Sequence, residues 1–265
     1  MSWRYVATAT EAVLAAGALQ RAKYGHEIQI EHKGEIDLVT EVDRESEAAI
    51  LEVIRERFPE HDIVAEETAL ERTGSRFVWF VDPLDGTTNF AHGYPFFCAS
   101  VALAVDEELA AAAVYDPIKR ELFTAERGGG AHLNGRRLKT SSSSRLLESL
   151  LVTGFPYDFR DDLEKSLRLF NRFMAEARAI RRDGAAALDL SYLSAGRIDA
   201  FWEERLKAWD VMAGALLVEE AGGRVTRFDG APLRLSADET LASNGPLHAA
   251  MLSVFQADRE ALVRA

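Results

Sequence analysis

The sequence has one cysteine and no long apolar run, and both absences narrow the class of protein. Cys98 has no second cysteine to pair with, so an internal disulfide is excluded and a reducing compartment is expected. Between Phe97 and Ala99 it is typical of a small buried hydrophobic residue rather than a catalytic thiol. No apolar run approaches the roughly 18 residues that a membrane-spanning helix needs, and residues 1–5 lack the basic and then apolar pattern of a signal peptide. We therefore expect a cytoplasmic protein without a membrane partner.

Positive charge is also scarce. The 265 residues include 31 Lys and Arg against 43 Asp and Glu, which gives a net charge of −12. A chain this acidic repels phosphate backbones, so no direct nucleic-acid partner is expected. An anionic substrate would need a positive mediator, and metal ions are the obvious candidate. The six histidines are scattered without ligand spacing, which argues against a zinc site.

The apolar fraction of 48% is enough for a packed core in one large domain or two small ones. Periodicity in the first half predicts two helices followed by a run of strands, over 8–24, 43–57, 63–65, 77–81, 97–105, 109–115 and 121–125. The second half alternates strands and helices, over 149–154, 161–177, 179–182, 185–195, 198–203, 209–221, 223–228, 240–243 and 246–262. A low-complexity stretch at 140–144 predicts a boundary near residue 145, between halves 1–145 and 146–265. The predicted fold class is α/β, with an antiparallel sheet packed on helices and a second, α/β-layered half.

The segment 79–90 is the most informative in the chain. A buried strand delivers Asp82 to its end, Pro83 is expected to stop the strand ladder, and Asp85 follows three residues after Asp82. Two carboxylates on such a tight turn repel each other unless a cation lies between them. Residues 86–88, Gly-Thr-Thr, could then open a helix whose free N–H groups hold a phosphate. A plain helix-capping turn explains Asp85 equally well.

Other acidic residues gather at the ends of predicted elements. Glu66-Glu67 follows a buried strand, the acidic segment 37–43 leads into the second helix, and Trp209-Asp210 opens an apolar helix. Each is weak evidence alone, because Asp is an ordinary helix cap. Together they form the oxygen-rich environment that a hard divalent cation requires.

The combined pattern resembles the inositol monophosphatase family, part of the wider magnesium-dependent, lithium-sensitive sugar phosphatase superfamily. The resemblance runs in register over nearly the whole chain, through Asp37-x-x-Thr40-x-x-Asp43, Glu66-Glu67, Asp82-Pro83-Leu84-Asp85-Gly86-Thr87-Thr88-Asn89-Phe90, Trp209-Asp210 and Glu219-Glu220-Ala221-Gly222-Gly223. It implies an alternating αβαβα sandwich and a phosphoric monoester hydrolase, with myo-inositol monophosphate as the expected substrate. Met212 is a departure, because the family usually has a small residue there.

The resemblance also implies roles in metal binding and catalysis. A first Mg²⁺ is expected on Glu66, Asp82 and the Leu84 carbonyl, and a second on Asp82, Asp85 and Asp210. Glu66 would hold a weaker third ion through water. Thr87 and Asp43 resemble the pair that orients and deprotonates the attacking water, so the expected catalytic residues are Asp43, Thr87, Glu66 and Asp82.

For the substrate, the resemblance implies backbone N–H groups of Gly86 and Thr87 on the phosphate. Substrate hydroxyls would be contacted by Asp85, Gly184, Ala186, Glu203 and Asp210. Lys33 resembles a basic residue on a mobile loop over the site. Homodimer assembly and lithium sensitivity are also implied.

Several alternatives stay open. Fructose 1,6-bisphosphate or a 3′-phosphoadenosine nucleotide could be the substrate, although the nucleotide enzymes usually carry longer insertions than 265 residues allow. A partner-binding regulatory protein on the same fold, for instance in transcription, is a different class. Intact metal ligands argue against a purely non-catalytic role. Arg181-Arg182 could face an anionic substrate but favours an interface or structural role, and the glycines 128–130 predict a turn rather than a phosphate loop.

Overall fold

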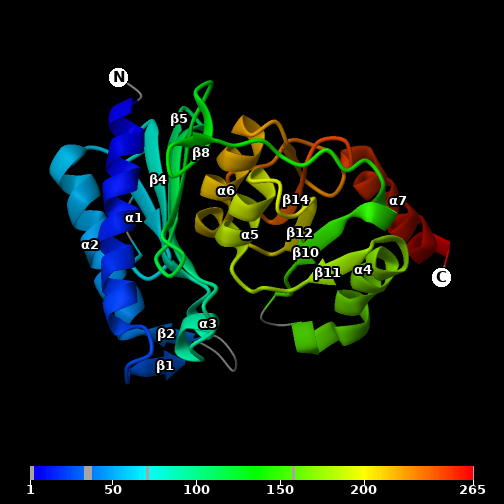
Figure 1. Ribbon diagram of the computed structural model, residues 1–265, viewed down its shortest axis with the longest axis horizontal. Coiled ribbons are helices and arrows are strands. Elements are labelled where there is room, and N and C mark those ends of the chain that lie inside the picture. The colour runs from blue at the N-terminus through cyan, green and yellow to red at the C-terminus, as the bar shows by residue number, and fades with distance from the viewer. Residues whose placement is uncertain (1–2, 33–37, 70–71, 157–158, 265) are drawn as a thin grey trace.

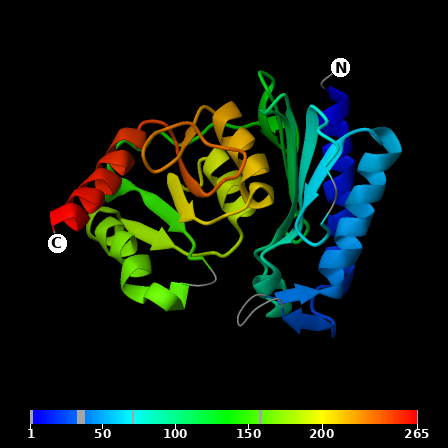
Figure 2. The same cartoon turned by 180° about the vertical axis from the view of Figure 1, so that it is seen from behind.

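The computed structural model describes residues 3–32, 38–69, 72–156 and 159–264. It is a stack of five layers, which confirms the predicted α/β sandwich (Figure 1). Helices α1 (Trp3–Lys23) and α2 (Glu41–Arg57) cover the outer face of the first sheet. Helices α5 (Ala186–Ser194) and α6 (Ala208–Glu220) lie between the two sheets, and α4 (Leu163–Glu176) and α7 (His248–Arg264) cover the far side of the second. Figure 2 shows the same order from behind.

The first sheet has seven strands in the order of the sequence, from β3 to β9. Only β3 and β4 are parallel, and the following strands form the predicted antiparallel meander. Its strands are β3 (Asp62–Ala65), β4 (Phe77–Asp85), β5 (Cys98–Val105), β6 (Glu108–Asp116), β7 (Glu121–Glu126), β8 (Gly130–Leu133) and β9 (Arg136–Arg137). A short hairpin of β1 (Ile30–His32) and β2 (Leu38–Thr40), which the sequence did not suggest, precedes α2.

Strand β4 is longer than predicted, and the expectation that Pro83 ends its ladder is wrong. Asp82 pairs with Ser100 and Asp85 pairs with Cys98, with a register shift between them. The bulge absorbs Pro83, which has no N–H to donate, and the ladder resumes beyond it. The short helix α3 (Thr87–Ala91) then begins directly after Gly86.

The second sheet has the order β11-β10-β12-β14-β13. Its strands are β10 (Leu150–Thr153), β11 (Ala179–Arg181), β12 (Ala200–Glu204), β13 (Arg224–Thr226) and β14 (Glu239–Ser243). Short 3₁₀ helices at Leu146–Glu148 and Phe159–Asp162 precede β10 and α4. The strand and helix alternation follows the predicted order, and the boundary near residue 145 stays a prediction.

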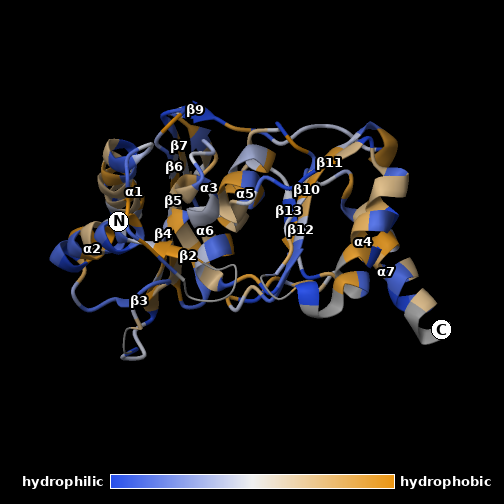
Figure 3. Ribbon diagram, turned by 90° about the horizontal axis from the view of Figure 1, so that it is seen from below, coloured by the Kyte–Doolittle hydropathy of each residue, from blue (hydrophilic) through white to orange (hydrophobic). Residues whose placement is uncertain are grey.

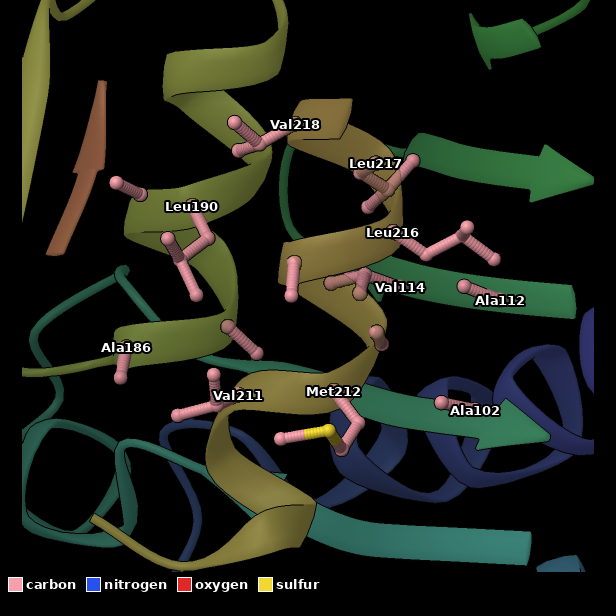
Figure 4. Packing of buried hydrophobic residues seen from close by; sticks show 14 of the residues in the cluster. Ala102, Ala112, Val114, Ala186, Leu190, Val211, Met212, Leu216, Leu217 and Val218 are labelled. Carbon is pink, nitrogen blue, oxygen red and sulfur yellow. The ribbon is translucent and has the colours of Figure 1, made fainter. Parts of the chain in front are cut away.

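The main core lies between the sheets and is built around α6. This helix is apolar on every side, as expected for a helix buried between two layers. Figure 4 shows Met212 and Leu216 beside the small Ala102 and Ala112 of the first sheet. Met212 is fully buried there, so the departure from the family's small residue is absorbed by packing against small side chains.

Strand β4 is buried on both faces, as its apolar sequence predicts. Val78 and Phe80 belong to the core between the sheets, whereas Trp79 and Val81 pack under α1 and α2. Figure 3 shows the five layers from below, with a mixed hydrophilic and hydrophobic α2 on the outside. Cys98 is buried, as expected. None of the helices in the described part of the chain has the length and apolarity that crossing a bilayer requires.

His248 joins two strands of the second sheet through a buried hydrogen-bond chain. Its Nε2 lies 2.9 Å from the Thr226 hydroxyl, and its Nδ1 lies 2.9 Å from the Ser243 hydroxyl. The Thr226 hydroxyl donates to the Arg227 carbonyl, so it accepts from Nε2–H and leaves Nδ1 as the acceptor. Burial, and then the charge of Arg224, lowers the pKa of His248 to about 4.

We predict that His248 makes the protein less stable at acidic pH. The folded-state pKa of about 4 lies below the reference value of 6.5, so the unfolded chain binds the proton more tightly. Stability is therefore lost as pH falls from about 6.5 toward 4, by about 3 kcal/mol at 1.36 kcal/mol per pKa unit. Denaturant unfolding across this range should show the advantage of the wild type over His248→Gln shrinking with falling pH. The control His26→Gln changes an exposed histidine, and its stability should vary with pH as that of the wild type does. A stability difference between the wild type and His248→Gln that stays constant with pH would contradict the prediction.

Candidate active site

The bulge at the end of β4 places two acidic side chains at the start of α3. Asp82 is 2% exposed, and its Oδ1 accepts a hydrogen bond from the Leu84 N–H at 3.0 Å. Gly86 has a φ of 89°, and a Cβ there would lie 3.0 Å from the Phe96 carbonyl oxygen. Only glycine fits this turn without strain.

Asp85 connects the end of β4 to the start of α5, which lies about 100 residues further along the chain. Its Oδ2 accepts hydrogen bonds from the N–H of Ala187 at 2.7 Å and of Leu188 at 3.4 Å. The Cys98 thiol lies 3.6 Å from the same oxygen. A carboxylate at a helix N-terminus satisfies free N–H groups and meets the positive end of the helix dipole. Asp85 therefore does not cap α3, whose N-terminal cap is Gly86, and its carboxylate instead accepts from N–H groups in the first turn of α5.

Asp43 and Thr87, 44 residues apart, are joined by a hydrogen bond. The Thr87 hydroxyl lies 2.8 Å from Asp43 Oδ1 and 3.0 Å from the Leu84 carbonyl oxygen. Asp43 Oδ2 accepts from the Thr40 N–H at 2.8 Å and from the Thr40 hydroxyl at 2.6 Å, which completes a capping box on α2. Thr87 makes no cap on α3, whose N-terminal cap is Gly86. The structure therefore brings the predicted pair together, and their catalytic roles stay predictions.

Burial dominates the electrostatics of the site, and repulsion between neighbouring acids adds to it at Asp82 and Asp85. Burial, and then the charges of Glu66, Asp85 and Asp210, raise the pKa of Asp82 well above its usual value. Burial raises the pKa of Asp85 to about 7, although the N–H groups of α5 oppose the rise. Burial likewise raises the pKa of Asp43. A cation among these groups would remove the repulsion and keep the carboxylates ionised.

The donor set fits Mg²⁺ in its chemistry. Carboxylates of Glu66, Asp82, Asp85 and Asp210 and the carbonyl of Leu84 supply only oxygen, which hard cations prefer. Within the described ranges, however, no three His, Cys, Asp or Glu side chains are arranged as the ligands of one ion.

Glu203 and Asp210 bring the second half of the chain to the site. Asp210 lies in the first turn of α6, where its Oδ2 accepts from the Lys207 N–H at 2.7 Å. Glu203 is half-buried on β12, and burial, followed by the charges of Asp210 and Asp85, raises its pKa to about 8. A Cβ on Gly154 would lie 2.2 Å from Glu203 Oε1, so this glycine makes room for the carboxyl group.

Gly184 and Ala186 lie where α5 begins, beside the N–H groups that bind Asp85. Gly184 has a φ of 83°, and Ala186 is the first residue of the helix. The Asn89 side chain connects the segment before α5 to the first half of the chain. Its Nδ2 donates to the Asp183 carbonyl at 2.8 Å and to the Phe96 carbonyl at 2.7 Å. The predicted loop residue Lys33 lies outside the described residues, as does Asp37.

Sequence reasoning missed several residues around the site. Asp189 on α5 is 2% exposed, and burial, with the charges of Asp183, Asp85 and Glu203, raises its pKa well above the usual value. An Asp within the apolar run 185–190 was the available signal. Gln20 of α1 donates to the Pro83 carbonyl, and Glu47 of α2 accepts from the Glu67 N–H. Nothing in the sequence around either residue indicated these contacts.

Two further sequence features are placed by the structure. Arg182 lies over the Phe155 ring at 5.5 Å, and its charge opposes the rise in the pKa of Glu203. The glycines 128–130 form the predicted turn, and the N–H groups of Gly128 and Gly130 each donate to the Glu220 carboxylate at 2.9 Å. The N–H groups of this turn therefore bind the side chain of Glu220.

Comparison with known proteins agrees with this geometry. The sequence pattern of the inositol monophosphatase family matches residues 3–260. An inositol-1-monophosphatase of Synechocystis sp. is 46% identical over 242 residues, which cover 91% of this chain and 84% of the relative. A protein of Pseudomonas aeruginosa named Nus factor SuhB is 45% identical over 234 residues, 86% of each chain.

Solved structures share the fold. The structure of inositol monophosphatase from Anabaena (Nostoc) sp. superposes with a TM-score of 0.87 at 41% identity, and 96% of each chain is covered. The resemblance carried by the acidic motifs is thereby confirmed over the whole fold, and the chain belongs to the inositol monophosphatase family, a family of phosphatases.

Proposed function

We propose that this phosphatase hydrolyses a small phosphate monoester in a Mg²⁺-dependent reaction, with myo-inositol monophosphate as the preferred substrate. The observation that carries the proposal is the Thr87–Asp43 hydrogen bond of 2.8 Å beside the buried, mutually repelling Asp82 and Asp85. The substrate follows from the name of the relative in Synechocystis sp..

The metal site would use the residues already described. Glu66, Asp82 and the Leu84 carbonyl would hold one Mg²⁺, and Asp82, Asp85 and Asp210 would hold a second, with a third ion attached more weakly near Glu66. Bound Mg²⁺ supplies charge neutralisation of the phosphoryl oxygens, a lowered pKa for water and stabilisation of the leaving alkoxide.

The chain itself would orient the nucleophile. The Thr87 hydroxyl has one hydrogen, and the carboxylate Oδ1 of Asp43 at 2.8 Å is a stronger acceptor than the Leu84 carbonyl at 3.0 Å. With that hydrogen committed to Asp43, a lone pair of the Thr87 oxygen can accept a hydrogen bond from the attacking water. The proton can then pass through the hydroxyl to Asp43, whose pKa burial has raised.

The remaining residues would bind and orient the substrate. N–H groups of Gly86 and Thr87 would meet the phosphate, while Gly184, Ala186, Glu203 and Asp210 would surround the polyol. Asp85 would contact it through the carboxylate oxygen that is not held by α5. A panel of phosphate monoesters assayed with Mg²⁺ tests this assignment, and a higher kcat/KM for fructose 1,6-bisphosphate would favour the sugar-bisphosphate alternative.

A partner-binding regulatory role is a second candidate, and several relatives carry the name Nus factor SuhB. The catalytic role and the partner-binding role can be tested separately. A variant that lacks the proposed metal ligands would lose activity but keep the outer surfaces that a partner would bind. Homodimer assembly and lithium inhibition remain expectations from the family.

Replacing Asp82 by Asn should abolish activity while stabilising the metal-free protein. The amide oxygen of Asn can still accept from Leu84, but the variant loses the charge that repels Glu66, Asp85 and Asp210. Mg²⁺ should raise the melting temperature of the wild type and not that of Asp82→Asn, and EDTA should inactivate the wild type reversibly. Asp106→Asn, at an exposed turn, serves as the matched control. A fully active Asp82→Asn would refute the metal-site assignment.

Replacing Thr87 by Ala should lower kcat by roughly 10²–10⁴, the usual contribution of general acid–base catalysis. KM should change far less, because Thr87 would offer the phosphate its backbone N–H, which the variant retains. Thr87→Ser keeps the hydroxyl and should recover most of the activity. Steady-state kinetics and thermal melts of both variants provide the measurement. A folded Thr87→Ala with near-normal kcat would remove Thr87 from the mechanism.

A further inference from the structure

The peptide unit between Pro83 and Leu84 is held from both sides by side chains. Its carbonyl oxygen, on Pro83, accepts a hydrogen bond of 2.6 Å from Gln20 Nε2 of α1. Its N–H, on Leu84, donates to Asp82 Oδ1 at 3.0 Å. Because the peptide is planar, Gln20 fixes the orientation of the N–H that holds the Asp82 carboxylate. Hydrogen bonds in series also polarise and strengthen one another.

A second helix holds the other segment that carries a predicted ligand. Glu47 of α2 is 2% exposed, and its Oε2 accepts from the Glu67 N–H at 2.8 Å. This N–H belongs to the peptide unit between Glu66 and Glu67. The Glu66 N–H in turn donates to the Val81 carbonyl at 3.2 Å. The backbone on both sides of Glu66 is therefore fixed.

Neither polar side chain is what core packing alone would favour. Gln20 is fully buried on a helix whose other buried positions include Ala12, Val13 and Ala16, and its Oε1 has no hydrogen-bond partner among the described residues. Burying a polar atom without a partner costs stability. Glu47 is an acidic side chain that is 2% exposed, and burying an acidic group is also costly. Side chains that oppose stability in this way are typical of functional sites.

We propose that Gln20 and Glu47 are positioning residues, which orient the backbone at Asp82 and Glu66 for metal binding. The inference rests on the proposed Mg²⁺ site and extends it to α1 and α2, the layer behind the first sheet. Residues that orient metal ligands typically change metal affinity or activity by about 10- to 100-fold when they are lost. The expected signature is weakened Mg²⁺ binding, beyond any loss of folding stability.

Four variants of the full chain test the proposal by calorimetric titration with Mg²⁺ and by thermal melts. Gln20→Met keeps the length of the side chain and removes the donor, and Gln20→Asn keeps the amide but is too short to reach Pro83. Glu47→Leu removes both charge and acceptor, whereas Glu47→Gln removes the charge and keeps an acceptor oxygen. Gln20→Met, Gln20→Asn and Glu47→Leu should bind Mg²⁺ about 10- to 100-fold more weakly. Glu47→Gln should stay within a few-fold of the wild type.

Val13→Ala and Ile54→Val are matched controls on the same two helices, because both side chains are apolar and fully buried and make no hydrogen bond to the backbone at Asp82 or Glu66. They should lower the melting temperature without changing the Mg²⁺ affinity. Wild-type affinity in folded Gln20→Met or Gln20→Asn would overturn the role of Gln20. A loss in Glu47→Gln equal to that in Glu47→Leu would assign the effect to charge and overturn the role of Glu47. Failure of the wild type to bind Mg²⁺ would instead refute the proposed function.

Discussion

The burial of several carboxylates close together at the end of β4 is the constraint on which the rest of the structure depends. Burial, and to a smaller extent the neighbouring acids, disfavour the ionised forms of Asp82 and Asp85. The raised pKa values of both side chains reflect this. The surrounding chain opposes that cost with donors: the Leu84 N–H on Asp82, and the N–H groups of α5 on Asp85. These donors hold the carboxylate oxygens in place at the end of β4 and at the start of α5.

Much of the fold could be predicted because its elements have strong local signals. Residues 77–81 are apolar throughout and lie on β4 with both faces buried, and the glycines 128–130 form the turn that their composition predicts. The β1–β2 hairpin lacked such a signal, because its strands have only three residues each. The continuation of β4 beyond Pro83 depended on a bulge opposite β5, which is a tertiary feature.

The residues of the candidate site also fall into two groups, those with a local sequence signal and those that only the folded chain reveals. Asp43, Asp82, Asp85 and Thr87 could be found from the sequence because they lie in compact motifs whose residue types suit metal and phosphate chemistry. Gln20 and Glu47 could not, because each acts on the backbone of a strand end that is distant in the sequence. Asp189 falls between these cases. Its unusual place in an apolar helix was visible, but its neighbours Asp183 and Glu203 became apparent only in the folded chain.

The contact between Asp85 and α5 also has a consequence for protein synthesis. During translation the first sheet can form before α5 and α6 leave the ribosome, with the inner side of β4 and β5 uncovered. Val78, Phe80 and Ala102 can then contact wrong partners until residues up to 220 have left the ribosome. The same late helices bring Asp210 and the N–H groups for Asp85. The two helices that cover this apolar face are therefore also the ones that complete the candidate site.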